Sequence, residues 1–195
     1  MGFYAAFFST ACERADRGYL SQDVGGGRFE DHRLVGDLLW NDVKQWFDPI
    51  ENGSAPDVVV ADTTLAHWQL VLDLIRSREW LFRYECGDRE TALPESAVDL
   101  FPAEDRERLT LLTVWPDPDL EWMVRPWAVE EILSDVDLYR LQGQERLDAF
   151  CRFLRTLGDV LQKDVFVYSE GDNTYPPMMT YDVAAGHVAF LADPW

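Results

Sequence analysis

The chain has 195 residues, of which 47% are hydrophobic and 13% aromatic, and its formal net charge is −19. A chain of this length and composition can bury a core without disulfides or metals, which excludes an intrinsically disordered protein. The acidity opposes binding to nucleic-acid phosphates and to anionic membranes, because both attract Lys and Arg, and it favours a cationic partner.

The N-terminal quarter predicts a strand, a short helix, a loop and a long helix. The apolar run Phe3–Phe8 predicts a buried strand, and Thr10–Arg17 a short helix. Gly25–Gly27 predicts a surface loop, because the Gly-Lys-Ser/Thr ending of a phosphate-binding loop does not follow it. Asp31–Phe47 has a capping residue and helical spacing of its apolar residues, and Pro49 ends it.

A strand, a helix and a second strand follow. Asp57–Ala61 centres on three valines and predicts a buried strand. The next helix is capped within Asp62–Thr64 and ends near Ser77. Trp80–Cys86 alternates as a strand does. The sequence fits both a parallel βαβ unit and an antiparallel return, and it does not decide between them.

The middle of the chain predicts a hairpin between two helical segments. Glu104–Arg108 predicts one helical turn, and Leu109–Trp115 a strand. A Pro-Asp-Pro-Asp turn then leads into Leu120–Val124, the second strand of the hairpin. Pro126 suits the first turn of a helix, which predicts a helix through about Leu133.

The C-terminal third predicts an amphipathic helix followed by a β-meander. Leu147 to Leu161 keeps the three-and-four spacing of one helix face. Gly158 within it costs about 1 kcal/mol relative to Ala, which indicates close packing against a sheet. The apolar runs Val165–Tyr168, Met178–Tyr181 and His187–Leu191 predict three short strands separated by turns.

These elements predict one α+β domain over residues 1–195. Its sheet is mixed or mainly antiparallel, with three to four helices packed on it, and its C-terminal helix precedes the meander. The three cysteines are an odd number and lie far apart, which favours reduced thiols in the cytoplasm over a disulfide framework. No apolar run approaches the roughly 20 residues that a membrane span needs.

No catalytic residue, metal site or cofactor is predicted. His32, His67 and His187 do not pair with other ligands at zinc spacing. Asp62 lies five residues before His67, which indicates helix capping more than a general base with its orienting acid. The Gly-x-Ser-x-Gly nucleophile motif is missing, and the acids after Trp115 lack the spacing of a calcium loop.

Two clusters are candidates for binding a partner. One is the acidic and aromatic segment Trp115–Trp122, because tryptophans are common interface anchors. The other is the turn that holds Glu170 and Asp172. The partner-binding candidates are therefore Trp115, Asp117, Asp119, Glu121, Trp122, Glu170 and Asp172.

Small size, acidity, many aromatic residues and no catalytic motif favour a non-enzymatic binding protein that neutralises a cationic protein, as an immunity protein does. Two alternatives stay open. One is an enzyme, such as a hydrolase, whose carboxylates or histidine are brought together only by folding. The other is a nucleic-acid mimic, which needs two rows of carboxylates at the spacing of duplex phosphates.

Overall fold

The computed structural model describes residues 38–101, 109–171 and 176–192, all within one unit, Gly36–Trp195. The predicted elements Phe3–Phe8, Thr10–Arg17, Gly25–Gly27 and Glu104–Arg108 lie outside the described residues, as does the start of the helix predicted from Asp31. The extent of the domain over residues 1–195 therefore stays a prediction.

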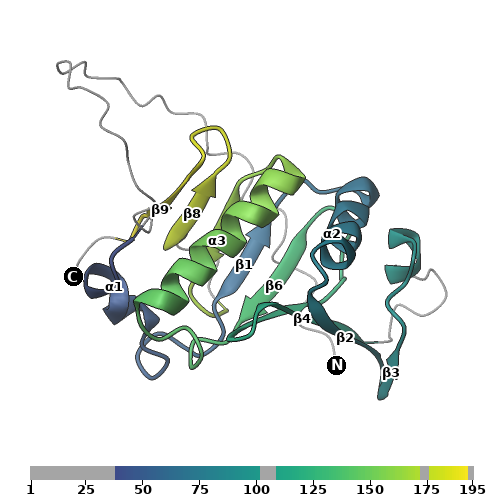
Figure 1. The fold of residues 1–195 in the computed structure, drawn as a ribbon, viewed down its shortest axis with the longest axis horizontal. Coiled ribbons are helices and arrows are strands. Elements are labelled where there is room, and N and C mark those ends of the chain that lie inside the picture. The colour runs from purple at the N-terminus through teal and green to yellow at the C-terminus, as the bar shows by residue number, and fades with distance from the viewer. Residues whose placement is uncertain (1–37, 102–108, 172–175, 193–195) are drawn as a thin grey trace. The chain divides into compact units, whose positions relative to one another are not determined.

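Nine strands form one sheet in the order β3–β2–β4–β5–β6–β1–β7–β8–β9 (Figure 1). Every pairing between the described strands is antiparallel. The strands are β1 (Asp57–Val60), β2 (Leu81–Cys86), β3 (Arg89–Thr91), β4 (Thr110–Asp117), β5 (Leu120–Val124), β6 (Ile132–Val136), β7 (Val165–Tyr168), β8 (Met179–Asp182) and β9 (His187–Phe190).

Helices α2 and α3 contact each other and cover one face of this sheet (Figure 1). The helical segments are α1 (Trp40–Val43), η2 (Lys44–Phe47), α2 (Leu65–Ser77), η3 (Ala97–Leu100) and α3 (Gln144–Leu161). The prediction of an α+β fold with a mainly antiparallel sheet is confirmed. The predicted order of C-terminal helix and meander is also confirmed, because β7, β8 and β9 are consecutive neighbours.

The segment from β1 through α2 to β2 crosses over three other strands. β6, β5 and β4 lie between β1 and β2 in the sheet. Since each of the four pairings is antiparallel, β1 and β2 run in the same direction without touching. The segment is therefore a parallel βαβ crossover, one of the two connections that the sequence left open, with three strands between its two strands, and the antiparallel return is excluded.

The helix predicted from Pro126 to Leu133 is wrong. Residues 125–131 form a loop, and Ile132 begins β6. The local burial alternates, with Ile132, Ser134 and Val136 all 0% exposed. Burial with a period of two and β-branched residues both favour a strand, and β6 pairs with β5 on one side and β1 on the other. Together these factors outweigh the helix-start signal of Pro126.

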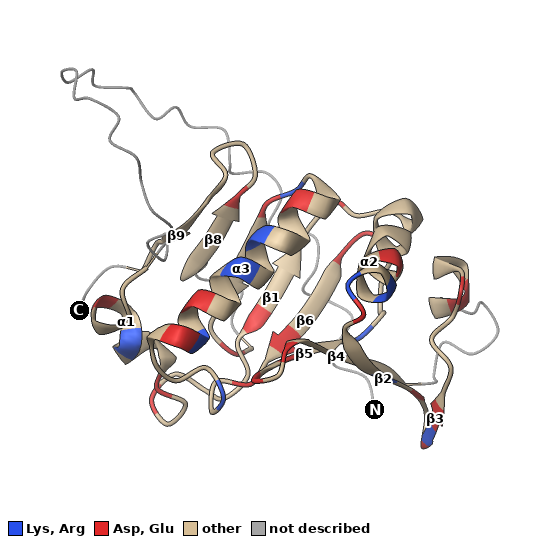
Figure 2. Ribbon diagram, viewed as in Figure 1, with Lys and Arg blue, Asp and Glu red and all other residues tan. Residues whose placement is uncertain are grey.

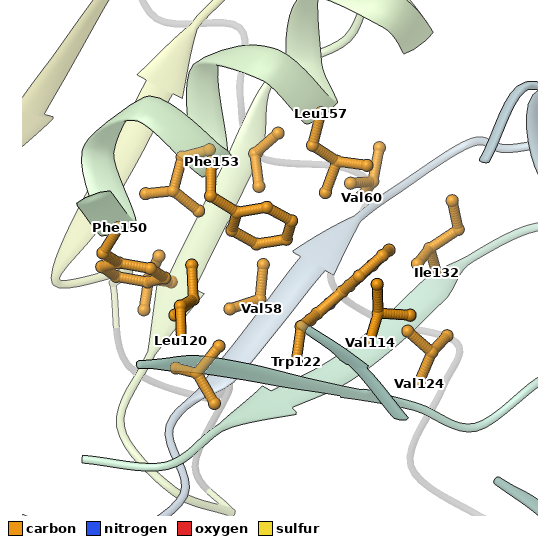
Figure 3. Packing of buried hydrophobic residues seen from close by; sticks show 14 of the residues in the cluster. Val58, Val60, Val114, Leu120, Trp122, Val124, Ile132, Phe150, Phe153 and Leu157 are labelled. Atoms are coloured by element: carbon orange, nitrogen blue, oxygen red, sulfur yellow. The ribbon is translucent and has the colours of Figure 1, made fainter. Parts of the chain in front are cut away.

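The core lies between the sheet and the two long helices. Figure 3 shows Phe153 and Leu157 of α3 above Val58 and Val60 of β1 and beside Trp122 of β5. The rings of Trp122 and Phe153 have centroids 5.0 Å apart and are tilted by 56°. Such aromatic pairs add about 0.5–1.5 kcal/mol beyond the burial of their area.

At Gly158, helix α3 lies in close contact with Tyr181 of β8. A Cβ atom at this position would lie 2.3 Å from Cδ1 of Tyr181 and 2.8 Å from the carbonyl oxygen of Lys163. The Tyr181 hydroxyl donates a hydrogen bond to Asp159 on the same helix. The prediction that Gly158 allows close packing against a sheet is therefore confirmed.

We expect Gly158→Ala to lower the free energy of unfolding by about 1–3 kcal/mol, because the added methyl group overpacks the contact with Tyr181. This loss outweighs the roughly 1 kcal/mol that alanine contributes through helix propensity. Urea denaturation measures the change. Thr156→Ala on the same helix is the control and should change stability little. Equal or higher stability of Gly158→Ala would contradict the packing argument.

Candidate functional site

The side of the sheet opposite α2 and α3 is covered by no helix of the described residues, and we call it the helix-free face. Side chains alternate along each strand, so residues next to the buried core positions point to this face. It carries Arg83 and Glu85 of β2, Trp115 of β4, Glu121 and Met123 of β5, Asp135 of β6, Asp57 and Val59 of β1, and Phe166 and Tyr168 of β7.

Two carboxyl groups lie side by side in the middle of this face. Asp57 of β1 and Asp135 of β6 are direct partners in the strand register, and their side chains share a hydrogen bond. Arg125, just beyond β5, forms an ion pair with Asp135. The amide of Gly171 donates to Oδ2 of Asp57 at 3.3 Å. Among the described residues, one guanidinium and one backbone amide therefore contact the two carboxyl groups.

This environment raises the pKa of Asp57 from 3.8 to about 6. Partial burial is the largest cause, because it disfavours the charged form. The negative charge of Asp135 and the hydrogen bond with it come next, and the charge of Glu170 adds a further small increase. The Gly171 amide acts in the opposite direction. Asp57 thus holds its proton into the weakly acidic range.

Burial also shifts the pKa of two neighbouring groups. Partial burial raises the pKa of Glu131, which directly precedes β6. Burial also raises the pKa of the Tyr168 hydroxyl, and the charge of Glu131 raises it further. Among the residues that the structure describes, no Lys or Arg forms an ion pair with Asp57 or Glu131. The centre of the helix-free face is therefore negative and incompletely neutralised.

The predicted cluster Trp115–Trp122 is divided by the β4–β5 hairpin. Trp115 and Glu121 lie on the helix-free face, and the indole Nε1 of Trp115 donates to Glu121 at 3.3 Å. Glu121 also lies 3.6 Å from Arg140, and Asp119 lies 2.5 Å from Arg146. Asp117 accepts the amide of Asp119 at 3.3 Å, within the turn. The turn acids are thus held by hydrogen bonds or arginines.

Trp122 and the second predicted cluster have structural roles. Trp122 is 0% exposed, and its side chain is part of the core. The carboxylate of Glu170 accepts the amides of Ser54 at 2.6 Å and Ala55 at 3.1 Å, which joins the end of β7 to the segment before β1. Asp172 lies outside the described residues.

The cap of α2 lies within Asp62–Thr64 as predicted, and it is Thr64, with His67 completing the capping box. Thr64 is the N-cap of α2, and its hydroxyl accepts the amide of His67 at 3.5 Å. Nδ1 of His67 accepts the amide of Thr64 at 3.0 Å. Asp62 makes no contact with His67 in this capping box. Within the described ranges, no group of three or more His, Cys, Asp or Glu is arranged to hold a metal ion.

A pocket of about 260 Å³ opens beside Arg125 at one end of the helix-free face. It is lined by Glu85, Gly87, Leu109, Thr110, Leu111, Arg125 and Trp127. Arg125 thus lines the pocket and also pairs with Asp135 of the carboxyl pair. The sequence did not single out Asp57, Asp135 or this pocket, because no motif links residues that only strand register brings together.

Comparison of the chain with protein-family models, curated proteins and solved structures finds no match. In the part of the chain that the structure describes, no helix is long and apolar enough to cross a membrane. The site is therefore interpreted from its own geometry.

We expect Asp57→Asn to stabilise the protein increasingly as the pH rises from 4 to 7. A carboxyl whose pKa is raised from 3.8 in the unfolded chain to about 6 in the folded protein contributes stability below about pH 4. That contribution is lost as the pH rises through about 6. Asparagine keeps an acceptor for the Gly171 amide and has no charge to repel Asp135.

Urea denaturation at several pH values between 4 and 7 measures this difference between variant and wild type. Asp88→Asn, which removes a carboxylate from the exposed turn between β2 and β3, controls for the change in net charge. A stability difference for Asp57→Asn that stays constant over the whole range would show that the carboxyl pair is not coupled as described.

Proposed function

We propose that this protein is a non-enzymatic binding protein of the immunity-protein type, which engages and neutralises a cationic protein through its helix-free face. The observation that carries the proposal is the pair Asp57 and Asp135, side by side on a sheet face that no described helix covers, with the Arg125 guanidinium paired to Asp135. A positive group of a partner would relieve this repulsion.

The charge distribution supports a cationic partner. The described residues hold 25 Asp and Glu against 11 Lys and Arg. Figure 2 shows Asp and Glu, in red, at the lower ends of β1 and β6. An anionic surface of this kind steers a cationic protein toward it and disfavours acidic partners.

The composition of the helix-free face also suits a protein interface. Aromatic residues, Met and Arg are enriched at interfaces, and this face presents Trp115, Met123, Phe166 and Tyr168 around its charged groups. Trp115 and Glu121, from the predicted cluster, lie on the same face. The proposal therefore keeps these two candidates and adds Asp57, Asp135 and Glu131.

An enzyme is the second candidate, and the raised pKa of Asp57 favours it. A carboxyl that titrates near pH 6 is suited to general acid–base catalysis. The described pocket, however, is lined by Arg125 and Glu85 and not by Asp57. Asp57 lies directly against a second carboxyl group, an arrangement that a cationic group of a partner would offset, so we place binding first.

We expect the protein to bind a fluorescent hexa-arginine peptide, and the double variant Asp57→Asn/Glu131→Gln to bind it about tenfold more weakly. Each charge near a surface contributes about 0.2–1 kcal/mol to such an ion pair. Fluorescence anisotropy at about 0.05 and 0.5 M NaCl measures the affinity, which should fall at the higher salt.

The control is Asp99→Asn/Glu145→Gln, which removes two exposed acids from η3 and α3 on the other side of the sheet. If both double variants weaken binding equally, the partner is attracted by net charge alone and not by the helix-free face.

We also expect affinity for the same peptide to increase as the pH rises from 5 to 7. Asp57, with a pKa of about 6, must lose its proton before it can attract a guanidinium. The pH dependence should be smaller in Asp57→Asn. Anisotropy titrations at constant ionic strength test this, and a wild-type affinity that does not change with pH would exclude Asp57 from the contact.

A further inference from the structure

The pocket beside Arg125 has apolar walls that are open to solvent. Leu109 is 65% exposed and Trp127 is 62% exposed, and both line the pocket. Gly87 lies directly opposite Leu109, and its amide donates to the Leu109 carbonyl at 2.8 Å.

The size of the pocket suits one side chain of a partner. Its volume of about 260 Å³ lies below the roughly 300–1,000 Å³ of pockets that enclose drug-sized molecules. Exposed apolar residues around a small cavity are typical of the anchor positions of protein interfaces, where one aromatic residue or arginine of the partner is buried.

The pocket offers an acceptor for a cation. Glu85 lines it, and its side chain is 33% exposed and lies 3.3 Å from Nε of Arg83. That contact leaves further acceptor positions on the carboxylate. Arg125 also lines the pocket, but its guanidinium pairs with Asp135. Both charged lining residues are therefore paired, and Glu85 is the one that can accept from a further donor.

The exposed indole of Trp127 favours arginine over lysine. A guanidinium is planar and stacks on an aromatic face, where it gains a cation–π attraction of about 0.5–1 kcal/mol at exposed sites. The methylene groups of the same side chain fit apolar walls such as Leu109 and Leu111. The guanidinium can at the same time donate to the Glu85 carboxylate.

We propose that this pocket receives an arginine side chain of the cationic protein partner, with Trp127 as the stacking surface and Glu85 as the acceptor. The proposal rests on the proposed function and names the residue type that the partner presents at this end of the helix-free face.

The test compares three labelled peptides, hexa-arginine, hexa-lysine and hexa-glutamate, by fluorescence anisotropy against wild type, Trp127→Leu and Glu85→Gln. We expect wild type to bind hexa-arginine about two- to fivefold more tightly than hexa-lysine, from the cation–π contribution. Trp127→Leu keeps an apolar side chain and should abolish this preference. Glu85→Gln should weaken both cationic peptides.

Tyr139→Ala is the matched control, because Tyr139 is another exposed aromatic residue, 66% exposed, and does not line the pocket. It should leave the affinities unchanged. Circular dichroism shows whether each variant is folded. In addition, hexa-arginine should shift the indole amide resonance of Trp127 in wild type, which reports on the pocket without any substitution.

Equal affinity for the two cationic peptides, or an arginine preference that survives Trp127→Leu, would overturn the pocket proposal. The proposed function would stand in that case if Asp57→Asn/Glu131→Gln still weakened binding. Failure of wild type to bind either cationic peptide would overturn the proposed function itself. Tighter binding of hexa-glutamate would overturn both, because Arg125 would then be the determinant.

Discussion

The packing of Val58 and Val60 under α3 determines which way every other residue of β1 points. Both valines are 0% exposed and belong to the core that Phe153 and Leu157 complete. Because side chains alternate along a strand, burying these valines places Asp57 and Val59 on the opposite face. The neighbouring strands pair with β1 in fixed register, so Asp135 meets Asp57 there. The acidic pair is thus a consequence of how the hydrophobic core is assembled.

Arginines are distributed unevenly over the acids of the described residues. At the hairpin between β4 and β5, Arg140 and Arg146 neutralise Glu121 and Asp119. At the centre of the sheet, Arg125 pairs with Asp135, whereas Asp57 forms no ion pair with a described Lys or Arg. Surface ion pairs contribute little to stability, so the arginines at the hairpin act mainly to neutralise the acids beside them. At the centre, the raised pKa of Asp57 means that the folded protein disfavours its ionised form.

Most individual elements could be predicted from local patterns, whereas the site could not. The spacing of Leu147 to Leu161 predicted α3, and the valines of β1 predicted a buried strand, because burial imposes a period that survives in one sequence. The helix predicted from Pro126 falls on a loop and the first residues of β6, since Pro126 is a local signal and the pairing of β6 with β5 and β1 is not. The Asp57–Asp135 pair depends on that same pairing. Its two members are far apart in the chain, and no spacing rule relates them.

Core packing holds two like charges close together, and their repulsion raises the free energy of the folded protein. A cationic ligand that binds beside them lowers this free energy. Any cation that binds the folded protein and not the unfolded chain stabilises the folded state by mass action. The gain is largest where the folded state is least compensated, which on this face is beside Asp57 and Glu131. Many natural proteins retain such destabilising arrangements where they bind or react, although suitable substitutions there can increase stability at a cost in function. A carboxyl pair that served only the fold would be better replaced by an acid and an amide. Its presence in the centre of an otherwise regular sheet therefore favours a surface that is completed by a positively charged partner.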